Sequence, residues 1–428
     1  MAEAKLGVGF VATLAVSMGI GPLLIYGLTA TGPLVIADLG LSRAQFGSFA
    51  TVAFLAAAVS SGVFGRLVDL YSERTTMAVL YVGSAAALLL ASVAQSYVGV
   101  LLAVVVSGCV QALSNPVTNR LVSRYAAPQG RGLLMGVKQS GVQMAQLTAG
   151  VALPTLALVA GWRGALGAAA VIAGVGLLFA WRFVPHLPTR AADSAGPGSA
   201  VAVPRAVWWL TSYALLTGAA LQASNVYLPL YGYEELHLSV ATAGLTAAVV
   251  GGVGLVARVG WGQLADRLAS PRTPLLLLAL VAGLGAMFIY LAGELSAVWL
   301  LWTGAAVFGA TGIASNVVLM IAVLRLSPAP LIGRASGLLA IGLYLGFALG
   351  PVTFGAVVDA TSSYQVGWVG VAATYAAAAV LVLAGRFRLP TTSPPPPADV
   401  SPDPVRSTRA IPADLKGLSC SPRKTTSS

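Results

Sequence analysis

Long apolar runs that carry almost no charge are the feature that most constrains this chain. About twelve runs of roughly twenty residues can be placed along it, and an α-helix needs about twenty apolar residues to cross the hydrocarbon core of a membrane. The 428-residue chain is 57% hydrophobic and 9% charged, whereas soluble proteins carry about 25% charged residues. The sequence therefore predicts an all-α, polytopic membrane protein with twelve transmembrane helices.

The runs fall into two groups of six. The first six spans are expected near 7–30, 44–64, 77–94, 98–118, 133–157 and 165–183. The second six are expected near 206–230, 240–261, 274–292, 297–322, 333–357 and 366–385. Two stretches rich in Pro and Ser, one between the groups and one at the end, have the composition of a flexible linker and a disordered tail. We predict an N-terminal six-helix bundle (1–184), a cytoplasmic linker (185–205), a C-terminal six-helix bundle (206–388) and a cytoplasmic tail (389–428).

The distribution of positive charge predicts the orientation. Of 24 Lys and Arg residues, only Arg43 and Arg163 fall in loops assigned to the outside, and only Lys138 and Arg258 fall within spans. The rest lie in segments assigned to the cytoplasm, including the basic connection 120–131, as the positive-inside rule expects. We therefore place both termini in the cytoplasm and the protein in the cytoplasmic membrane. The net charge of +11 has this origin and does not indicate a nucleic-acid partner.

A charged turn between spans 2 and 3 returns in the second half of the chain. The first copy contains Gly65, Asp69 and Arg74, and the second contains Gly262, Asp266 and Arg267. The two aspartates are 197 residues apart, and Leu41-Ser42 is matched by Leu238-Ser239 at the same offset. Ser114-Asn115 is matched by Ser315-Asn316 at an offset of 201. These matches predict two pseudo-symmetric bundles, a plan in which transporters bind substrate between the halves.

With these motifs the chain resembles the major facilitator superfamily over about residues 7–386. The carrying residues are Gly65, Asp69 and Arg74, similar to the family's Gly-x-x-x-Asp-(Arg/Lys)-x-Gly-(Arg/Lys) motif, with a weaker copy at Gly262, Asp266 and Arg267. The resemblance implies a gate, in which the aspartate accepts bonds from the start of a neighbouring helix and pairs with a nearby arginine.

The motif also departs from the family pattern. Leu70 and Ser72 replace a usual basic residue and a usual glycine, and Pro271 interrupts the second copy. The alternative interpretation is a turn that charge keeps in water.

Two cations within the spans are candidates for substrate binding, because an ionisable group inside a membrane is costly. Lys138 lies in span 5 and Arg258 in span 8, and no Asp or Glu lies deep in any span to pair with them. The surrounding residues Lys138-Gln139-Ser140-Gly141 resemble those of cyanate/nitroimidazole-type porters, and Arg258-x-Gly260-x-Gly262 resembles monocarboxylate and oxalate/formate-type porters. Both short resemblances imply small anions. Alternatively, Lys138 reaches the membrane interface and Arg258 supports the gate.

Uncharged polar residues at helical spacing extend this candidate site. The candidate substrate-binding residues besides the two cations are Gln111, Asn115, Gln139, Gln143, Asn225, Asn316 and Tyr26. Polar stripes of this kind also serve only to join membrane helices.

We therefore expect a secondary transporter that moves a small, carboxylate-like anion by alternating access, as a monomer in the lipid bilayer, with protons as a further partner. The alternative is a proton-coupled exporter of drugs or a neutral metabolite. The chain shows no metal-ligand spacing, nucleophile motif or phosphate loop, and its histidines, His186 and His237, lie outside the spans. An enzyme, a cofactor and a metal site are not expected.

Overall fold

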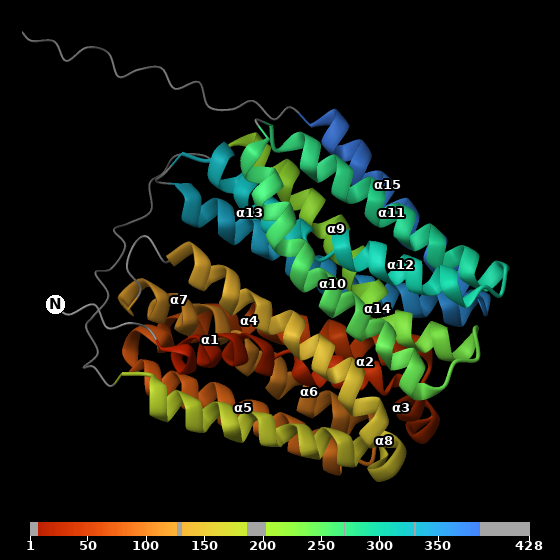
Figure 1. Cartoon of the computed structure of the whole chain (residues 1–428), viewed down its shortest axis with the longest axis horizontal. Coiled ribbons are helices and arrows are strands. Elements are labelled where there is room, and N and C mark those ends of the chain that lie inside the picture. Colours follow the sequence, from red (N-terminus) through yellow and green to blue (C-terminus); the bar gives the residue numbers. More distant parts are fainter. Residues whose placement is uncertain (1–6, 126–130, 186–202, 269, 329–330, 386–428) are drawn as a thin grey trace, which may run out of the picture. The chain divides into compact units, whose positions relative to one another are not determined.

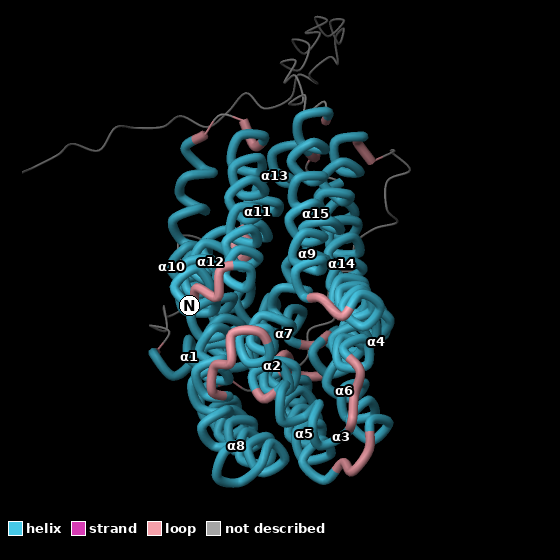
Figure 2. The backbone as a smooth tube through the Cα atoms, turned by 90° about the vertical axis from the view of Figure 1, so that its right-hand side faces the viewer, coloured by secondary structure: helices cyan, strands magenta, loops and turns pink. Residues whose placement is uncertain are grey.

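A computed structural model describes residues 7–125, 131–185, 203–268, 270–328 and 331–385. The described residues form helices and short loops, with no strand among them (Figure 2). Helices satisfy every backbone N–H and C=O within one segment, which a membrane interior demands. The predicted linker and tail lie outside the described residues except for residues 185 and 203–205, so the predicted domain boundaries stay a prediction.

The N-terminal half contains eight helices among the described residues. They are α1 (Val8–Ile20), α2 (Leu23–Ala30), α3 (Gly32–Leu39), α4 (Arg43–Leu70), α5 (Glu73–Val93), α6 (Tyr97–Gln111), α7 (Ser114–Tyr125) and α8 (Arg131–Phe183). The described C-terminal half contains α9 (Arg205–Glu234), α10 (Val240–Arg267), α11 (Arg272–Glu294), α12 (Val298–Thr311), α13 (Ser315–Leu326), α14 (Ile332–Thr361) and α15 (Tyr364–Ala384). Figure 1 shows α1–α3 and α5–α8 on one side and α9–α13 and α15 on the other.

These helices confirm the twelve predicted crossings. Nine helices in the described ranges are long and apolar enough to cross a membrane, and the pair α1 and α2, bent by 58°, makes ten. Helix α8 contains 53 residues, which at 1.5 Å per residue is about 80 Å and enough for two crossings. Helix α9, with 30 residues, is long enough to be the twelfth.

Three details differ from the predicted spans. Spans 5 and 6 both lie within α8 and are separated by a single residue with non-helical angles, Gly161 (φ 70°, ψ 164°). The chain folds back there, because this backbone conformation is open almost only to glycine. The basic connection predicted at 120–131 is helical as far as Tyr125, and residues 32–39 form the short helix α3.

The sequence repeat has a structural basis at the helix starts. Ser42 and Ser239 stand before α4 and α10, and their hydroxyls accept the backbone N–H groups of Gln45 (3.2 Å) and Thr242 (3.1 Å). Such N-caps each stabilise a helix by about 1 kcal/mol. The second match marks equivalent helix breaks, since α7 and α13 begin at Ser114 and Ser315.

The two halves pack closely near the residues where α4 begins and α14 ends, which we call the Arg43 end. The terminal end is the opposite one, where α1 begins and α15 ends. A Cβ added to Gly47 of α4 would lie 2.5 Å from the carbonyl oxygen of Pro351 in α14, and a Cβ at Gly244 of α10 would clash with Pro154 of α8. Both the glycines and the prolines are 197 residues apart. The repeat therefore brings a glycine against the proline of the other half at two places on the contact surface between the halves, which we call the seam; Gly47 meets the carbonyl oxygen of its proline and Gly244 meets the ring.

Candidate functional site

Lys138 is the most deeply buried of the predicted site residues, with a relative exposure of 1%. Its ammonium donates to Thr118 Oγ1 at 3.0 Å, to Asn119 Oδ1 and, at 3.4 Å, to Asn115 Oδ1. These acceptors stand at i, i+3 and i+4 on α7 and so share one helix face. The three donors of the ammonium group therefore meet three neutral oxygens. All three partners are uncharged, and no Asp or Glu pairs with Lys138 among the described residues.

Arg258 reaches the same cluster from the other half. Its guanidinium donates to the carbonyl oxygen of Gln139 at 3.2 Å, which joins α10 to α8. The Gln139 amide donates to Asn115 Oδ1 at 3.3 Å. This oxygen therefore accepts hydrogen bonds from both Gln139 and Lys138. We define the central cluster as Asn115, Thr118, Asn119, Lys138, Gln139 and Arg258.

The hydrogen bonds of Arg258 are incomplete. Its Nε atom is buried and has no hydrogen-bond partner in the described part of the chain. Tyr26 of α2 lies close enough to interact with the Arg258 charge, and α2 packs against α10. An unpaired guanidinium donor away from water costs free energy. A hydrogen-bond acceptor placed beside Arg258 Nε would remove this cost.

Further polar groups continue from the central cluster along α8. Gln146 donates to Asn225 Oδ1 of α9 at 3.2 Å, a second bond between the halves. The Oε1 atoms of Gln143 and Gln146 are buried and have no partner among the described residues. Buried amide groups normally find partners, so these are further positions for a polar ligand.

Other candidates lie apart from these bonds. Gln111 belongs to α6, beyond the helix break, and packs against Gly21. Asn316 is the second residue of α13, in the other half, and takes no part in the cluster's hydrogen bonds. Thr118 was not predicted as a site residue, although its position three residues after Asn115, on the same helix face, was a usable signal.

The predicted gate is described only in part. The side chains of Gly65, Asp69 and Asp266 lie outside the described residues. Arg74 donates from Nε to the carbonyl oxygen of Val184 at 2.6 Å. Arg267 is exposed, and Gly262 is half-buried near Val317. The role of all six residues as a gate stays a prediction.

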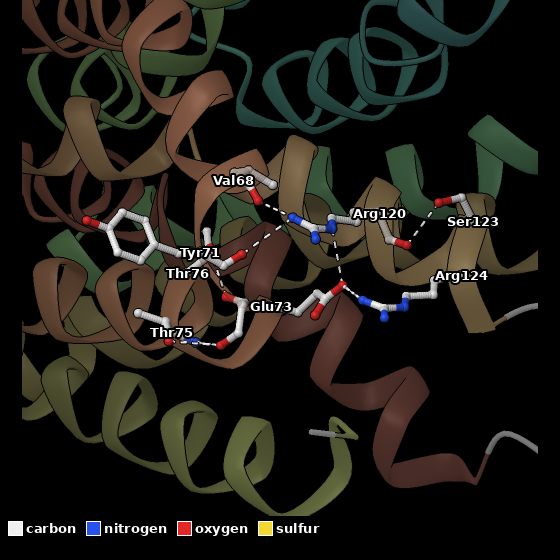
Figure 3. A network of polar contacts seen from close by, with 9 residues as sticks. Val68, Tyr71, Glu73, Thr75, Thr76, Arg120, Ser123 and Arg124 are labelled. Carbon is white, nitrogen blue, oxygen red and sulfur yellow. Dashed lines mark hydrogen bonds and ion pairs between the residues drawn. The ribbon is translucent and has the colours of Figure 1, made fainter. Parts of the chain in front are cut away.

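Glu73 organises the described part of this turn (Figure 3). Its carboxylate, 1% exposed, pairs with Arg120 at 3.1 Å and with Arg124 at 2.7 Å, both from α7. Arg120 also donates to the carbonyl oxygens of Val68 and Tyr71. Glu73 opens α5 directly after its N-cap, Ser72, where the helix dipole favours an acid. We did not predict a role for Glu73, because its partners stand about fifty residues later in the chain.

Ion pairs at the Arg43 end agree with the predicted grouping of the loops. Arg43 and Arg163, the two arginines assigned to outside loops, pair at 2.7 Å with Glu234 and Asp38 respectively. Within the described ranges, no group of three or more His, Cys, Asp or Glu side chains could hold a metal ion.

This architecture is similar to that of known proteins. The family model of the Major Facilitator Superfamily matches residues 6–351. No curated protein matches the chain. It is similar to the crystal structure of a bacterial homologue of the human lysosomal transporter Spinster, in an inward-facing and occupied conformation, with 16% identity, a TM-score of 0.71 and coverage of 87% of this chain and 95% of that one.

A second similar structure is that of the nucleoside transporter NupG. The identity is 16%, the TM-score 0.69, and the coverage 87% of this chain and 98% of that one. At such identities the likeness shows the fold alone. The family model, however, covers most of the residues, and the twelve crossings in two halves agree with it: this chain belongs to the Major Facilitator Superfamily.

Proposed function

We propose that the chain carries a small, carboxylate-like anion across the cytoplasmic membrane by alternating access, and that Arg258 binds this anion directly. The family and the fold make the chain a secondary transporter. The substrate class is our inference. The observation that carries it is the buried Nε of Arg258, which has no partner in the described structure.

The charge of the central cluster supports an anion. The cluster contains two cations, Lys138 and Arg258, and its other members are neutral. Charge within a membrane protein is costly unless it is paired, so an anion would offset this positive charge. A guanidinium presents donors in a planar fork that matches a carboxylate.

The two cations have different proposed roles. All three donors of Lys138 already have acceptors on α7. We therefore propose that Lys138 attracts the anion by its charge and joins α7 to α8, without contacting the anion. Arg258 has one of its donors on a carbonyl oxygen and an unpaired Nε. We therefore expect one carboxylate to be bound at Arg258, with Gln139, Gln143 and Tyr26 as the nearest candidates for contacts to the rest of the substrate.

Binding at this place fits transport between the halves. The bond from Arg258 to Gln139 and the bond from Gln146 to Asn225 both cross from one half to the other. Rocking of the halves would break and remake them. With the termini in the cytoplasm, as the positive charges predict, the Arg43 end faces outward and the closed seam lies on that side. Coupling would then run through the substrate, with a proton or by exchange of anions.

The binding claim is tested with the purified full chain in liposomes. Thermal unfolding is followed with formate, acetate, benzoate and oxalate, with the matching carboxamides, and with neutral drugs. A ligand that binds only the folded state stabilises it by RT ln(1 + [L]/Kd), about 2.7 kcal/mol at one hundred times Kd. We expect a carboxylate to stabilise the wild type and Arg258→Gln to abolish this shift.

Arg205→Gln is the matched control, because Arg205 is an exposed arginine at the start of α9. It should respond to the carboxylate like the wild type. Stabilisation by neutral compounds alone, unchanged in Arg258→Gln, would overturn the anion proposal and favour an exporter of drugs or a neutral metabolite.

A further inference from the structure

The first turn of α4 is capped by a residue from the opposite half. Asp359, in the last turn of α14, accepts the backbone N–H of Arg43 on Oδ1 at 2.9 Å and the N–H of Ala44 on Oδ2 at 2.8 Å. The first N–H groups of a helix have no partner within it, and the helix dipole favours an anion there. Both oxygens of one carboxylate thus satisfy two groups that α4 itself leaves open.

This cap is additional to a local one. Ser42 and Gln45 already form a reciprocal pair, in which each side chain accepts the backbone N–H of the other residue, at 3.2 and 2.9 Å. Helix α10, the repeat equivalent of α4, has the local cap from Ser239. However, the position in α8 that corresponds to Asp359, 197 residues earlier, is Trp162. A helix of this kind therefore forms without an acid from the other half, and Asp359 is not explained by the folding of α4.

Other bonds join Arg43 to the C-terminal half at the same place. Its guanidinium pairs with Glu234 of α9 at 2.7 Å, and Tyr364 of α15 donates to the same carboxylate at 2.7 Å. Its carbonyl oxygen accepts the hydroxyl of Tyr227 at 2.5 Å. A Cβ at Gly355 would lie 2.5 Å from that oxygen, so only glycine allows this approach. Arg43 thus contacts α9 and α14 directly, and Tyr364 of α15 is joined to it through Glu234.

The surroundings allow these bonds to break. A cavity of about 860 Å³ lies here, lined by Arg43, Glu234, Glu235 and Asp359 among others. The side chains of Arg43 and Glu234 remain 34% and 21% exposed. Charged groups released into such a cavity can be hydrated, so that opening does not leave them unpaired in a dry interior.

We propose that Asp359 is a conformation-dependent helix cap, which stabilises the state closed at the Arg43 end and thereby sets the balance between the two transport states. When the halves separate at this end, the carboxylate leaves the start of α4 and the state loses both charge-assisted bonds. A group that interacts with only one of two states shifts their ratio by that interaction. The inference concerns the conformational balance and does not depend on which substrate is carried.

The test measures the distance between the halves at the Arg43 end. Spin labels are placed at Gln95→Cys and Glu294→Cys, two exposed loop-side positions of opposite halves, in the full chain with Cys109→Ala and Cys420→Ser. Double electron–electron resonance then gives the populations of short and long distances. We expect Asp359→Asn and Asp359→Ala to raise the ratio of open to closed molecules at least about tenfold, the ratio that corresponds to losing one such bond.

Glu235→Gln is the matched control, since it removes an acid from the lining of the same cavity and Glu235 has no part in the cap. Its distances should remain those of the parent protein. Asp359→Asn keeps the side-chain volume and serves if the alanine variant does not fold. An unchanged ratio in a folded Asp359 variant would overturn the proposal, as would an equal shift in Glu235→Gln.

Discussion

At the scale of single residues, the two cations of the central cluster differ in how completely they are hydrogen-bonded. Lys138 has three oxygen acceptors on one helix. Arg258 has the carbonyl oxygen of Gln139 and leaves a buried Nε without a partner in the described structure. The sequence alone did not distinguish the two cations as candidates for binding an anion. Their hydrogen bonds favour Arg258, because in the described structure it still has a free donor.

This difference predicts unequal losses of affinity. Arg258→Gln should weaken carboxylate binding at least about a hundredfold, because two charge-assisted bonds of about 1.5–3 kcal/mol each are lost. Lys138→Gln should weaken it about tenfold, because only a charge several ångströms away is removed, worth about 1–2 kcal/mol at an effective dielectric constant near 20. Titrations followed by thermal shift give both dissociation constants. Equal losses would show that Lys138 also contacts the anion.

Glu73 is predicted to matter for stability. Its carboxylate holds Arg120 and Arg124 to the turn before α5. Glu73→Gln should lower the free energy of unfolding by about 2–3 kcal/mol, somewhat less than for a fully buried pair, because both arginines remain partly exposed. Unfolding in mixed micelles measures this loss. Glu294→Gln, at an exposed acid, is the control and should change stability by less than about 0.5 kcal/mol. A Glu73 variant as stable as the control would contradict the prediction.

At the scale of the helices, the apolar runs and serine caps were enough to predict the number of crossings and the repeat, because each depends on residues close in sequence. The turn between spans 5 and 6 lies at Gly161, within the gap predicted between residues 157 and 165, but one non-helical glycine is enough to make it. The partners of Glu73 and the cap of Asp359 on α4 could not be predicted. They join residues about 50 and more than 300 positions apart, and only the packed bundle brings them together.

Whether the turn at Gly161 depends on a glycine can be tested directly. Its angles, φ 70° and ψ 164°, lie in a region that side-chain-bearing residues adopt at a cost of about 1–3 kcal/mol. Gly161→Ala should therefore lower the free energy of unfolding by about that amount. Gly174→Ala, in the same helix with no atom near its added methyl group, should be neutral or slightly stabilising. The reverse order of stabilities would show that the turn is not strained by a side chain.

The glycine–proline contacts predict a different effect, on conformation. Gly47→Val places a side chain against the carbonyl oxygen of Pro351, so α4 and α14 should no longer approach at the Arg43 end. We expect the labels at Gln95→Cys and Glu294→Cys to report longer distances, and substrate flux to fall. Gly337→Val, also on the seam helix α14 but with open space around it, is the control. Short distances in Gly47→Val would mean that the contact is not needed for closure.

At the scale of the whole molecule, the same seam contains two separate sets of bonds between the halves. The bonds around Arg43 and the glycine–proline contacts join the halves at one end. The central cluster joins them through Arg258 and Gln139. A transporter must break both sets of bonds in each cycle, so contacts that are individually modest and close to water serve better than a dry, fully packed interface. Substrate bound at Arg258 would stabilise both transport states, whereas the proposed cap by Asp359 stabilises only the state that is closed at the Arg43 end.

The central claim is that the carried solute is an anion bound by Arg258, and flux into proteoliposomes tests it most directly. Uptake of a labelled carboxylate is compared with uptake of its carboxamide, which has nearly the same shape without the charge, for the wild type, Arg258→Gln and Arg205→Gln. We predict that the carboxylate enters through the wild type and Arg205→Gln and that the carboxamide does not. Arg258→Gln should reduce carboxylate uptake to the level of protein-free liposomes. Equal entry of both compounds, or full uptake by Arg258→Gln, would contradict the account.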